Sequence, residues 1–218
     1  MPLIDLSHPI EHGMTTYKGL PGPVIMDHMS RTDSRDHYAP GTEFHIGRIE
    51  MVANTGTYID APFHRLPQGV DIAALPLSSL ANLPVTLLRR AHNAPRAIGP
   101  EAFADLPLGG HAVLIHTSHD RHWSTDAYFQ DHPFLTRTAA ELLRDQGVTL
   151  VGIDSLNIDS TTDPQRPVHT ILLTAQIPIV EHLTNLAALP DTSARFFAVP
   201  APVRAIGSFP VRAFAFTP

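Results

Sequence analysis

Short apolar stretches, separated by turn-forming residues, recur along the whole chain. They are rich in β-branched or other apolar side chains, a composition typical of β-strands. The pattern predicts strands in six segments, at residues 3–7, 45–53, 84–89, 111–117, 148–154 and 177–181. Residues 195–216 alternate apolar residues with breaks, which indicates further strands near the rim of a site or a subunit contact.

Helical signals concentrate between the fourth and fifth predicted strands. In residues 136–147, Thr138 and Glu141 have the spacing of a capping box, and Gly147 suits the position just after a helix end. Shorter helices are predicted at residues 99–106 and near residues 76–84.

Many strands with few short helices predict an α/β fold. No glycine- or serine-rich linker divides the chain, so we expect one domain, residues 1–218. Its central mixed β-sheet or barrel is expected to curl around a core, with the short helices flanking it.

The amino-acid composition limits which partners and which metal ligands this protein can have. A net charge of −6 disfavours a nucleic-acid partner. The chain shows neither a signal-peptide pattern nor an apolar run of membrane-spanning length, so we expect a cytoplasmic protein with no membrane contact. Cysteine is absent, so any metal must bind nitrogen and oxygen ligands. Because 14 histidines stand against only 15 lysines and arginines, histidine is the residue type to follow.

One short stretch concentrates polar side chains. Asn54, Tyr58, Asp60 and His64 all hold even positions, and equal parity in an extended segment places side chains on one face. Pro62 should end regular pairing, so that a turn brings the histidine back toward the same pocket. The alternative is an ordinary strand edge, in which the tyrosine packs, the aspartate caps a turn and the histidine is solvated.

Other segments carry further potential ligands in similar contexts. His169 stands in "DPQRPVHTILL" and Glu181 in "IPIVEHLTNL". With "DLSHPIEHGMTTYKG" at 5–19 and "GIDSLNID" at 152–159, these segments resemble the metal-dependent cyclase family, which includes bacterial kynurenine formamidases and isatin hydrolases. The resemblance covers nearly the whole chain and implies a cyclase-like fold and a homodimer or larger homo-oligomer.

The family signature reads His-x-Gly-Thr-His-x-Asp-x-Pro-x-His, and here Asn54 and Tyr58 replace two metal-binding histidines. In the family, those histidines and the aspartate bind one divalent ion, and the aspartate with a later histidine and glutamate binds a second. The resemblance therefore implies that one divalent ion, zinc or manganese, is bound here by Asp60, His169 and Glu181.

Two hypotheses for the function remain open at this point. The first is an arylformamidase-like hydrolase of a small amide or cyclic amide, with metal-activated water, His64 as acid and base, and Tyr58 donating to the oxyanion. Tyr17 and Asn54 are then expected to bind the substrate, for which formylkynurenine is the family's best-known example. The second is a metal-free member in which Tyr58 fills the vacated site and hydrogen-bonds Asp60, and the pocket serves small-molecule binding or another reaction.

Overall fold

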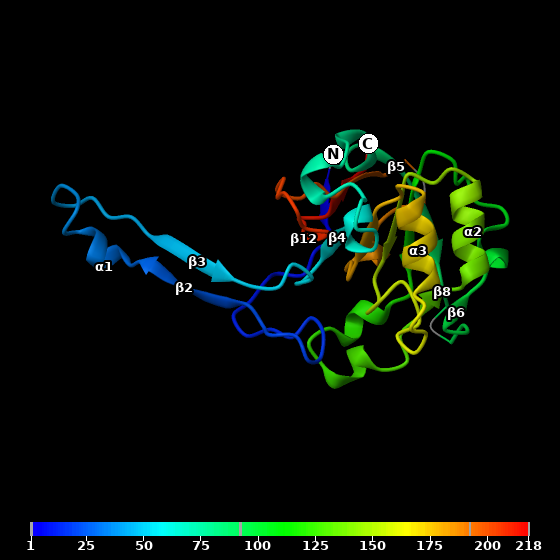
Figure 1. Cartoon of the computed structure of the whole chain (residues 1–218), viewed down its shortest axis with the longest axis horizontal. Helices are drawn as coiled ribbons and strands as arrows, with labels where there is room; N and C mark the ends of the chain where they lie inside the picture. Colours follow the sequence, from blue (N-terminus) through cyan, green and yellow to red (C-terminus); the bar gives the residue numbers. More distant parts are fainter. Residues whose placement is uncertain (1, 92, 192, 218) are drawn as a thin grey trace.

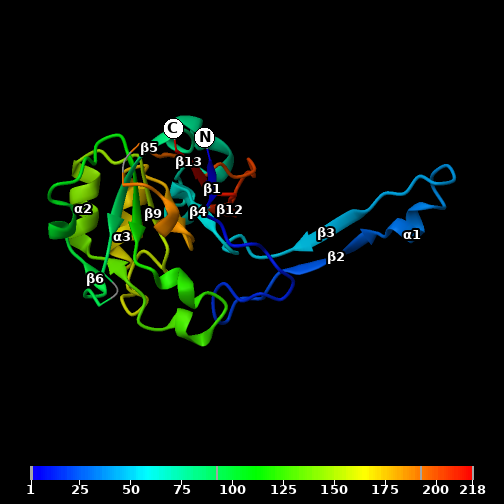
Figure 2. The same cartoon turned by 180° about the vertical axis from the view of Figure 1, so that it is seen from behind.

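A nine-stranded mixed β-sheet forms the body of the molecule (Figures 1 and 2). The structure is a computed structural model that describes residues 2–91, 93–191 and 193–217. In spatial order the strands are β1 (Leu3–Asp5), β13 (Phe214–Phe216), β11 (Arg195–Phe197), β5 (Leu83–Arg89), β7 (Ala112–His116), β9 (Leu150–Ile153), β10 (Ile179–Glu181), β4 (Tyr58–Asp60) and β12 (Ser208–Pro210). Strands β5, β7, β9 and β10 run parallel, and all other pairs in the sheet are antiparallel. The expected mixed α/β fold with a curled central sheet is confirmed.

The two faces of the sheet bury two separate cores. Along β7, Leu114 packs into the core enclosed by the curl, whereas Val113 and Ile115 on the other face pack against the helices. This alternation is the period-2 pattern of a strand buried on both sides. The helices on that second face are α2 (Arg137–Asp145) and α3 (Pro167–Thr174).

The predicted helices are present with changed boundaries. Helix α2 is capped by Thr136, whose side chain accepts from the Ala139 amide, so the capping position inferred for Thr138 was wrong. Gly147 lies just beyond the helix at φ +71°, as its position predicted. The two shorter helices are single 3₁₀ turns, η4 (Pro100–Phe103) and η3 (Leu77–Ser79). Further 3₁₀ turns are η1 (Pro62–His64), η2 (Ile72–Ala74), η5 (His119–His122), η6 (Asp126–Phe129) and η7 (Leu186–Ala188), and β6 (Ala97–Ile98) pairs with β8 (Phe134–Leu135).

A two-stranded arm projects from the body (Figures 1 and 2). It consists of β2 (Val24–Met29), the short helix α1 (Arg31–Ser34) and β3 (Ile46–Glu50). Strand β3 is the one predicted at residues 45–53, but it pairs only within this arm and not with the central sheet. Within the described residues, no helix has the length and apolarity needed to cross a membrane.

Candidate active site

Strand pairing places the polar residues of β4 opposite those of its two neighbours. Tyr58 pairs with Glu181 of β10, and Asp60 pairs with Ser208 of β12. Ile59 between them faces the apolar core, so the equal-parity interpretation of this segment is confirmed for its tyrosine and aspartate. The polar groups of three strands therefore converge on one side of the sheet.

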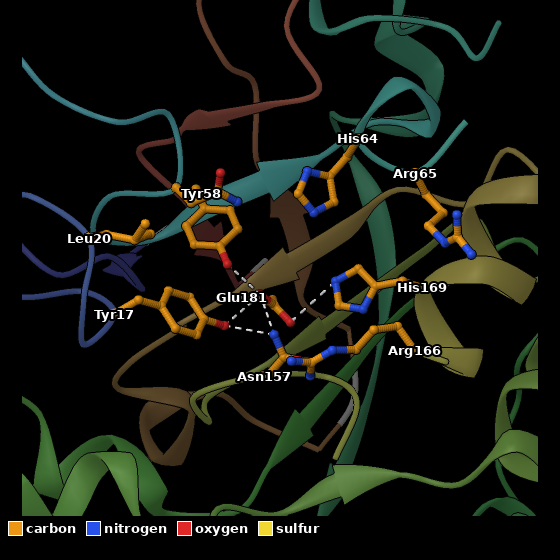
Figure 3. A pocket seen from close by; sticks show the side chains of 10 residues that line it. Tyr17, Leu20, Tyr58, His64, Arg65, Asn157, Arg166, His169 and Glu181 are labelled. Atoms are coloured by element: carbon orange, nitrogen blue, oxygen red, sulfur yellow. Dashed lines mark hydrogen bonds and ion pairs between the residues drawn. The ribbon is translucent and has the colours of Figure 1, made fainter. Parts of the chain in front are cut away.

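A cavity of about 320 Å³ opens over this convergence (Figure 3). Six of the seven sequence-predicted site residues line it, and Asp60 is fully buried within hydrogen-bonding or ionic reach of that lining. His64 reaches the cavity from the 3₁₀ turn that begins at Pro62, as predicted. The lining consists of Tyr17, Leu20, Asn54, Tyr58, His64, Arg65, Asn157, Arg166, His169 and Glu181.

Ser208 connects the aspartate to the histidine of the signature. Its hydroxyl donates to Asp60 Oδ1, lies 2.9 Å from His64 Nδ1 and accepts from Asn54 Nδ2 at 3.2 Å. Burial raises the pKa of Asp60, but the charges of His64 and His169 and the hydrogen bond from Ser208 outweigh it and hold that pKa below its usual value. An ionised Asp60 can only accept, so the single hydroxyl proton of Ser208 is committed to it. His64 must therefore donate through Nδ1–H, which leaves the lone pair of a neutral ring at Nε2.

His169 is oriented by a carboxylate behind it. Its Nδ1 lies 2.7 Å from Asp159 Oδ2, and Asp159 also accepts from the backbone amides of Val168 and His169 at the start of α3. The Nε2 atom then faces forward, 3.6 Å from Asp60 Oδ2 and 3.7 Å from Glu181 Oε1. A carboxylate behind the ring is the usual support of a metal-binding histidine.

These distances test whether a divalent ion fits the site. Two ligand atoms bound tetrahedrally to one zinc ion at about 2.0–2.2 Å lie about 3.3–3.6 Å apart. The separation from His169 Nε2 to Asp60 Oδ2, 3.6 Å, lies at the upper end of this range, and that to Glu181 Oε1, 3.7 Å, lies just above it. Both exceed the length of a good hydrogen bond. Asp60 Oδ2 is also buried without a hydrogen-bond partner, which an ion would supply. The residues present therefore fit one divalent ion.

Glu181 carries the second buried carboxylate and is held by hydroxyl and amide donors. Tyr58 donates to its Oε2 at 2.5 Å, and the backbone amide of Ile158 donates to its Oε1 at 2.6 Å. Burial is the largest influence and raises the pKa of Glu181 to about 7. Tyr17 stands beside this pair, accepts from Asn157 Nδ2 at 2.7 Å and donates to the Leu156 carbonyl oxygen (Figure 3).

The pKa of His169 is also raised, and for a histidine a raised pKa favours the charged form. Burial lowers its pKa, but the hydrogen bond to Asp159 and the charges of Asp60 and Glu181 raise it to about 10. An empty site therefore places a protonated imidazole between two carboxylates. A metal ion and this proton compete for the same Nε2 atom.

His64 offers another way to complete the ligand set. Ligand atoms of Asp60, His64 and His169 all lie within 4.8 Å of one another. Glu181, the third ligand implied by the resemblance, is fully buried and lies 3.7 Å from His169 Nε2, but it does not belong to this group. The His64 side chain is 37% exposed and is bonded through Nδ1 to Ser208. The exposed ring is better placed to exchange protons with a substrate.

Several residues at the site were missed by sequence reasoning. Ser208, Asp159, Arg65 and Arg166 lie outside the signature, and α3 was not predicted as a helix. Pro167 as its first residue was a usable signal for this helix start. Gly207 is a second signal, because a Cβ there would lie 2.3 Å from His64 Cα, so the backbone before Ser208 must pass close to the histidine.

Comparisons with known proteins agree with this architecture. A model of the Cyclase family ("Putative cyclase") matches residues 4–160. The chain is 29% identical to a kynurenine formamidase of Geobacillus thermodenitrificans over 97% of this chain and 96% of the relative. A solved structure described as a potential metal-dependent hydrolase with cyclase activity is 27% identical and superposes with a TM-score of 0.81 over 100% of this chain and 98% of that one.

A more distant structure shares the fold. Isatin hydrolase A from Labrenzia aggregata, bound to benzyl benzoate, superposes with a TM-score of 0.83 at 20% identity, over 99% of this chain and 93% of that chain. The family match spans well over half of the residues, and it includes the strand that carries Tyr58 and Asp60. By sequence and by fold, the chain belongs to the Cyclase family.

Proposed function

We propose that this protein is a metal-dependent hydrolase that cleaves the carbon–nitrogen bond of a small amide or cyclic amide, in the manner of an arylformamidase. The activities for which its relatives are named, kynurenine formamidase and isatin hydrolase, support this reaction class. The observation that carries the proposal is the position of His169 Nε2 between Asp60 Oδ2 and Glu181 Oε1, beside a histidine with a free lone pair. The proposal includes a cytoplasmic location.

Asp60, His169 and Glu181 would hold one zinc or manganese ion. When bound, such an ion supplies Lewis acidity to the substrate carbonyl and to water. The three ligands would leave a position open toward the cavity, as catalytic sites do. Behind them, Asp159, Ser208 and Tyr58 hold the ligands in place through the hydrogen bonds already described.

His64 would move the proton in this reaction. Its Nε2 accepts a proton from the attacking water, and the imidazolium then returns it to the leaving nitrogen as the bond to the carbonyl carbon breaks. Nδ1–H stays bonded to Ser208 throughout, which fixes the ring plane. Tyr58 donates to Glu181, so its expected role as an oxyanion donor requires that this bond opens during the reaction. Tyr17 and Asn54 line the cavity and are proposed to contact the substrate.

The metal-free alternative also has one supporting observation. A protonated His169 lies between the two carboxylates, and Ser208 and Tyr58 satisfy their outer oxygens. That arrangement balances charge without an ion, but it leaves Asp60 Oδ2 without a hydrogen-bond partner. Tyr58 bonds Glu181 in it, and not Asp60 as that hypothesis expected.

The test is turnover of formanilide and of a five-membered cyclic amide before and after chelation. We expect hydrolysis that disappears with the metal and returns when zinc or manganese is added back. His64→Gln should keep the metal and lose about 10²- to 10⁴-fold in kcat, whereas Glu181→Gln should lose the metal itself. Turnover that survives complete metal removal would overturn the proposal, as would metal binding without cleavage of either amide.

A further inference from the structure

His182 directly follows Glu181, the last residue of β10, but is not part of the cavity lining. Its backbone φ is +57°, in the left-handed region that residues with a side chain rarely adopt. A strand continued through this position would point the side chain away from that of Glu181. The turn instead packs the ring, which is fully buried, against the rings of Tyr17 and Tyr58. His182 therefore contacts both tyrosines that line the cavity.

The two tyrosines connect the His182 ring to the carboxylate of Glu181. The Tyr17 ring meets the His182 ring at 88° with the centroids 5.4 Å apart, and the Tyr58 ring meets it at 47° and 5.2 Å. Both separations suit favourable aromatic pairs. The hydroxyls at the far ends lie 3.5 Å and 2.5 Å from Glu181 Oε2, and Figure 3 shows both directed at this carboxylate. The position of one imidazole thus bears on two hydroxyls at the proposed metal site.

Further contacts fix the orientation of the His182 ring. The Tyr128 hydroxyl lies 2.8 Å from Nδ1 and has no other hydrogen-bond partner in the described part of the chain. Burial lowers the pKa of His182 to about 3, so the ring is neutral and Nδ1 accepts that hydroxyl hydrogen. On the backbone, the hydroxyl of Thr57, the residue before Tyr58, donates to the His182 carbonyl at 2.6 Å. The ring plane is therefore set relative to the tyrosines.

A side chain that only filled this space would not need to be polar. His182 Nε2 is buried without a hydrogen-bond partner, which costs stability. An apolar ring would avoid that cost, but it could not accept from Tyr128 and would lose the bond that sets its orientation. The histidine thus provides a ring of fixed orientation and not volume alone.

Tyr58 is the residue through which this orientation reaches the proposed metal site. Its hydroxyl donates to Glu181 Oε2 at 2.5 Å, and both residues are buried, so water cannot readily replace this donor. If the tyrosine ring shifted, Glu181 would lose its shortest hydrogen bond at Oε2 and keep the Ile158 amide at Oε1. A metal-binding carboxylate that loses such a donor holds its ion more weakly.

We infer that His182 is a positioning residue of the proposed metal site, whose ring, oriented by Tyr128, holds the Tyr58 hydroxyl on Glu181. His182 touches neither the ion nor the substrate and acts through Tyr58. The inference rests on the proposed function for its metal ion, but the position of the tyrosine can be measured without one.

The experiment measures zinc affinity by competition with a chromophoric chelator. His182→Asn removes the ring and introduces a residue that tolerates the left-handed backbone, and we expect about tenfold weaker binding. Tyr128→Phe removes only the hydroxyl that orients the ring and should cause a smaller loss. In a Tyr58→Phe background neither substitution should weaken binding further, because the hydroxyl through which both act is gone.

His119→Asn is the matched control. His119 is also a buried histidine, packs on Tyr128 at 5.1 Å between ring centroids and bonds to its carbonyl, but its ring does not contact Tyr58. We expect this variant to lose stability and to keep the zinc affinity of the wild type.

Crystal structures of the metal-free wild type and of His182→Asn give a measurement that needs no ion. We expect the Tyr58 hydroxyl to lie beyond hydrogen-bond distance of Glu181 Oε2 in the variant. If the wild type binds no zinc, the proposed function fails and this distance still decides the inference. An unchanged bond between Tyr58 and Glu181 in the variant would overturn it. So would an equal loss of zinc affinity with and without the Tyr58 hydroxyl, or the same loss in the His119 control.

Discussion

At the scale of single residues, the site depends on one hydroxyl that the signature does not contain. Ser208 keeps Asp60 Oδ1 satisfied and gives His64 Nδ1–H its acceptor. Without Ser208, Asp60 Oδ1 would need another donor, and the Ser208 hydroxyl also accepts from Asn54 Nδ2. Hydrogen bonds to one hydroxyl thus connect the side chains of Asn54, Asp60 and His64.

We expect Ser208→Ala to lower kcat about 10- to 100-fold, the usual effect of removing a residue that supports a metal ligand. The reason is that Asp60 Oδ1 loses its donor and the His64 ring becomes free to change tautomer. Ser208→Thr keeps the hydroxyl and should recover most of the activity. Steady-state kinetics with thermal unfolding of both variants checks this, and an alanine variant as active as the wild type would contradict the assigned role.

A buried histidine away from the cavity lining predicts acid sensitivity. Burial lowers the pKa of His132 to about 4, so the ring is neutral in the fold but takes up a proton in the unfolded chain below its ordinary pKa of 6.5. Its contribution to stability is complete above about pH 6.5 and is lost as the pH falls toward 4. At pH 5 the loss is about 2 kcal/mol.

His132→Gln should therefore reduce the drop in unfolding free energy between pH 7.5 and pH 5.0. Urea denaturation of both metal-free proteins at the two pH values measures it, and removing the metal keeps ion release out of the comparison. The same pH dependence in both proteins would show that His132 does not cause it.

Much of the site could be predicted from sequence because its residues lie in recognisable patterns. The even spacing of Tyr58 and Asp60 follows strand geometry, and the family signature points to His64. Ser208 could not be found this way, since its place opposite Asp60 comes from the pairing of β12 with β4, and the left-handed backbone of Arg166 before α3 is likewise not visible in the sequence. The pairing of strands far apart in the sequence and the conformation of a single turn cannot be recognised from the composition of a short segment.

At the scale of elements, helix α2 offers a direct test of where a helix begins. Thr136 caps it through the Ala139 amide, so Thr136→Ala should cost about 1 kcal/mol of unfolding free energy. Thr138→Ala, two residues on and exposed, is the control and should change stability by less than about 0.5 kcal/mol. Chemical denaturation measures the unfolding free energy of both variants. A larger loss from Thr138→Ala than from Thr136→Ala would support the capping position predicted from sequence.

The sequence predicted which segments form strands better than it predicted which strands pair with each other. The apolar runs that became β5, β7 and β9 are buried on both sides, so composition alone identified them. Strand β3 has two isoleucines but also Arg48 and Glu50, and it lies in an exposed arm whose other strand, β2, was not predicted. Local pattern reports strand propensity, whereas the choice of partner depends on the whole chain.

At the scale of the whole molecule, the arm presents apolar side chains to solvent. The exposed large hydrophobic residues on it are Val24, Ile25, Met26, Tyr38, Phe44, Ile46 and Ile49. An isolated two-stranded sheet is at best marginally stable in water, and a projecting apolar patch of this kind marks an interaction surface. We propose that the arm packs against a second copy of the chain, in line with the homo-oligomer expected from the family resemblance.

Ile49→Lys should dissociate this oligomer, because the side chain is 57% exposed and would place a charge in the buried contact. Leu77→Lys is the matched control, since Leu77 is 67% exposed but lies on the body of the molecule. Light scattering coupled to size exclusion gives the masses of all three proteins. A monomeric wild type, or an unchanged mass for the arm variant, would contradict the proposal.

The central claim is that Asp60, His169 and Glu181 form a site for one divalent ion although two ligands of the family signature are replaced. The most direct measurement is elemental analysis of the protein purified without added metal or an affinity tag, beside an Asp60→Ala, His169→Ala variant. We predict about one zinc or manganese per wild-type chain and none in the variant. No metal in the wild type after soaking with both ions, or equal metal in both proteins, would contradict the account.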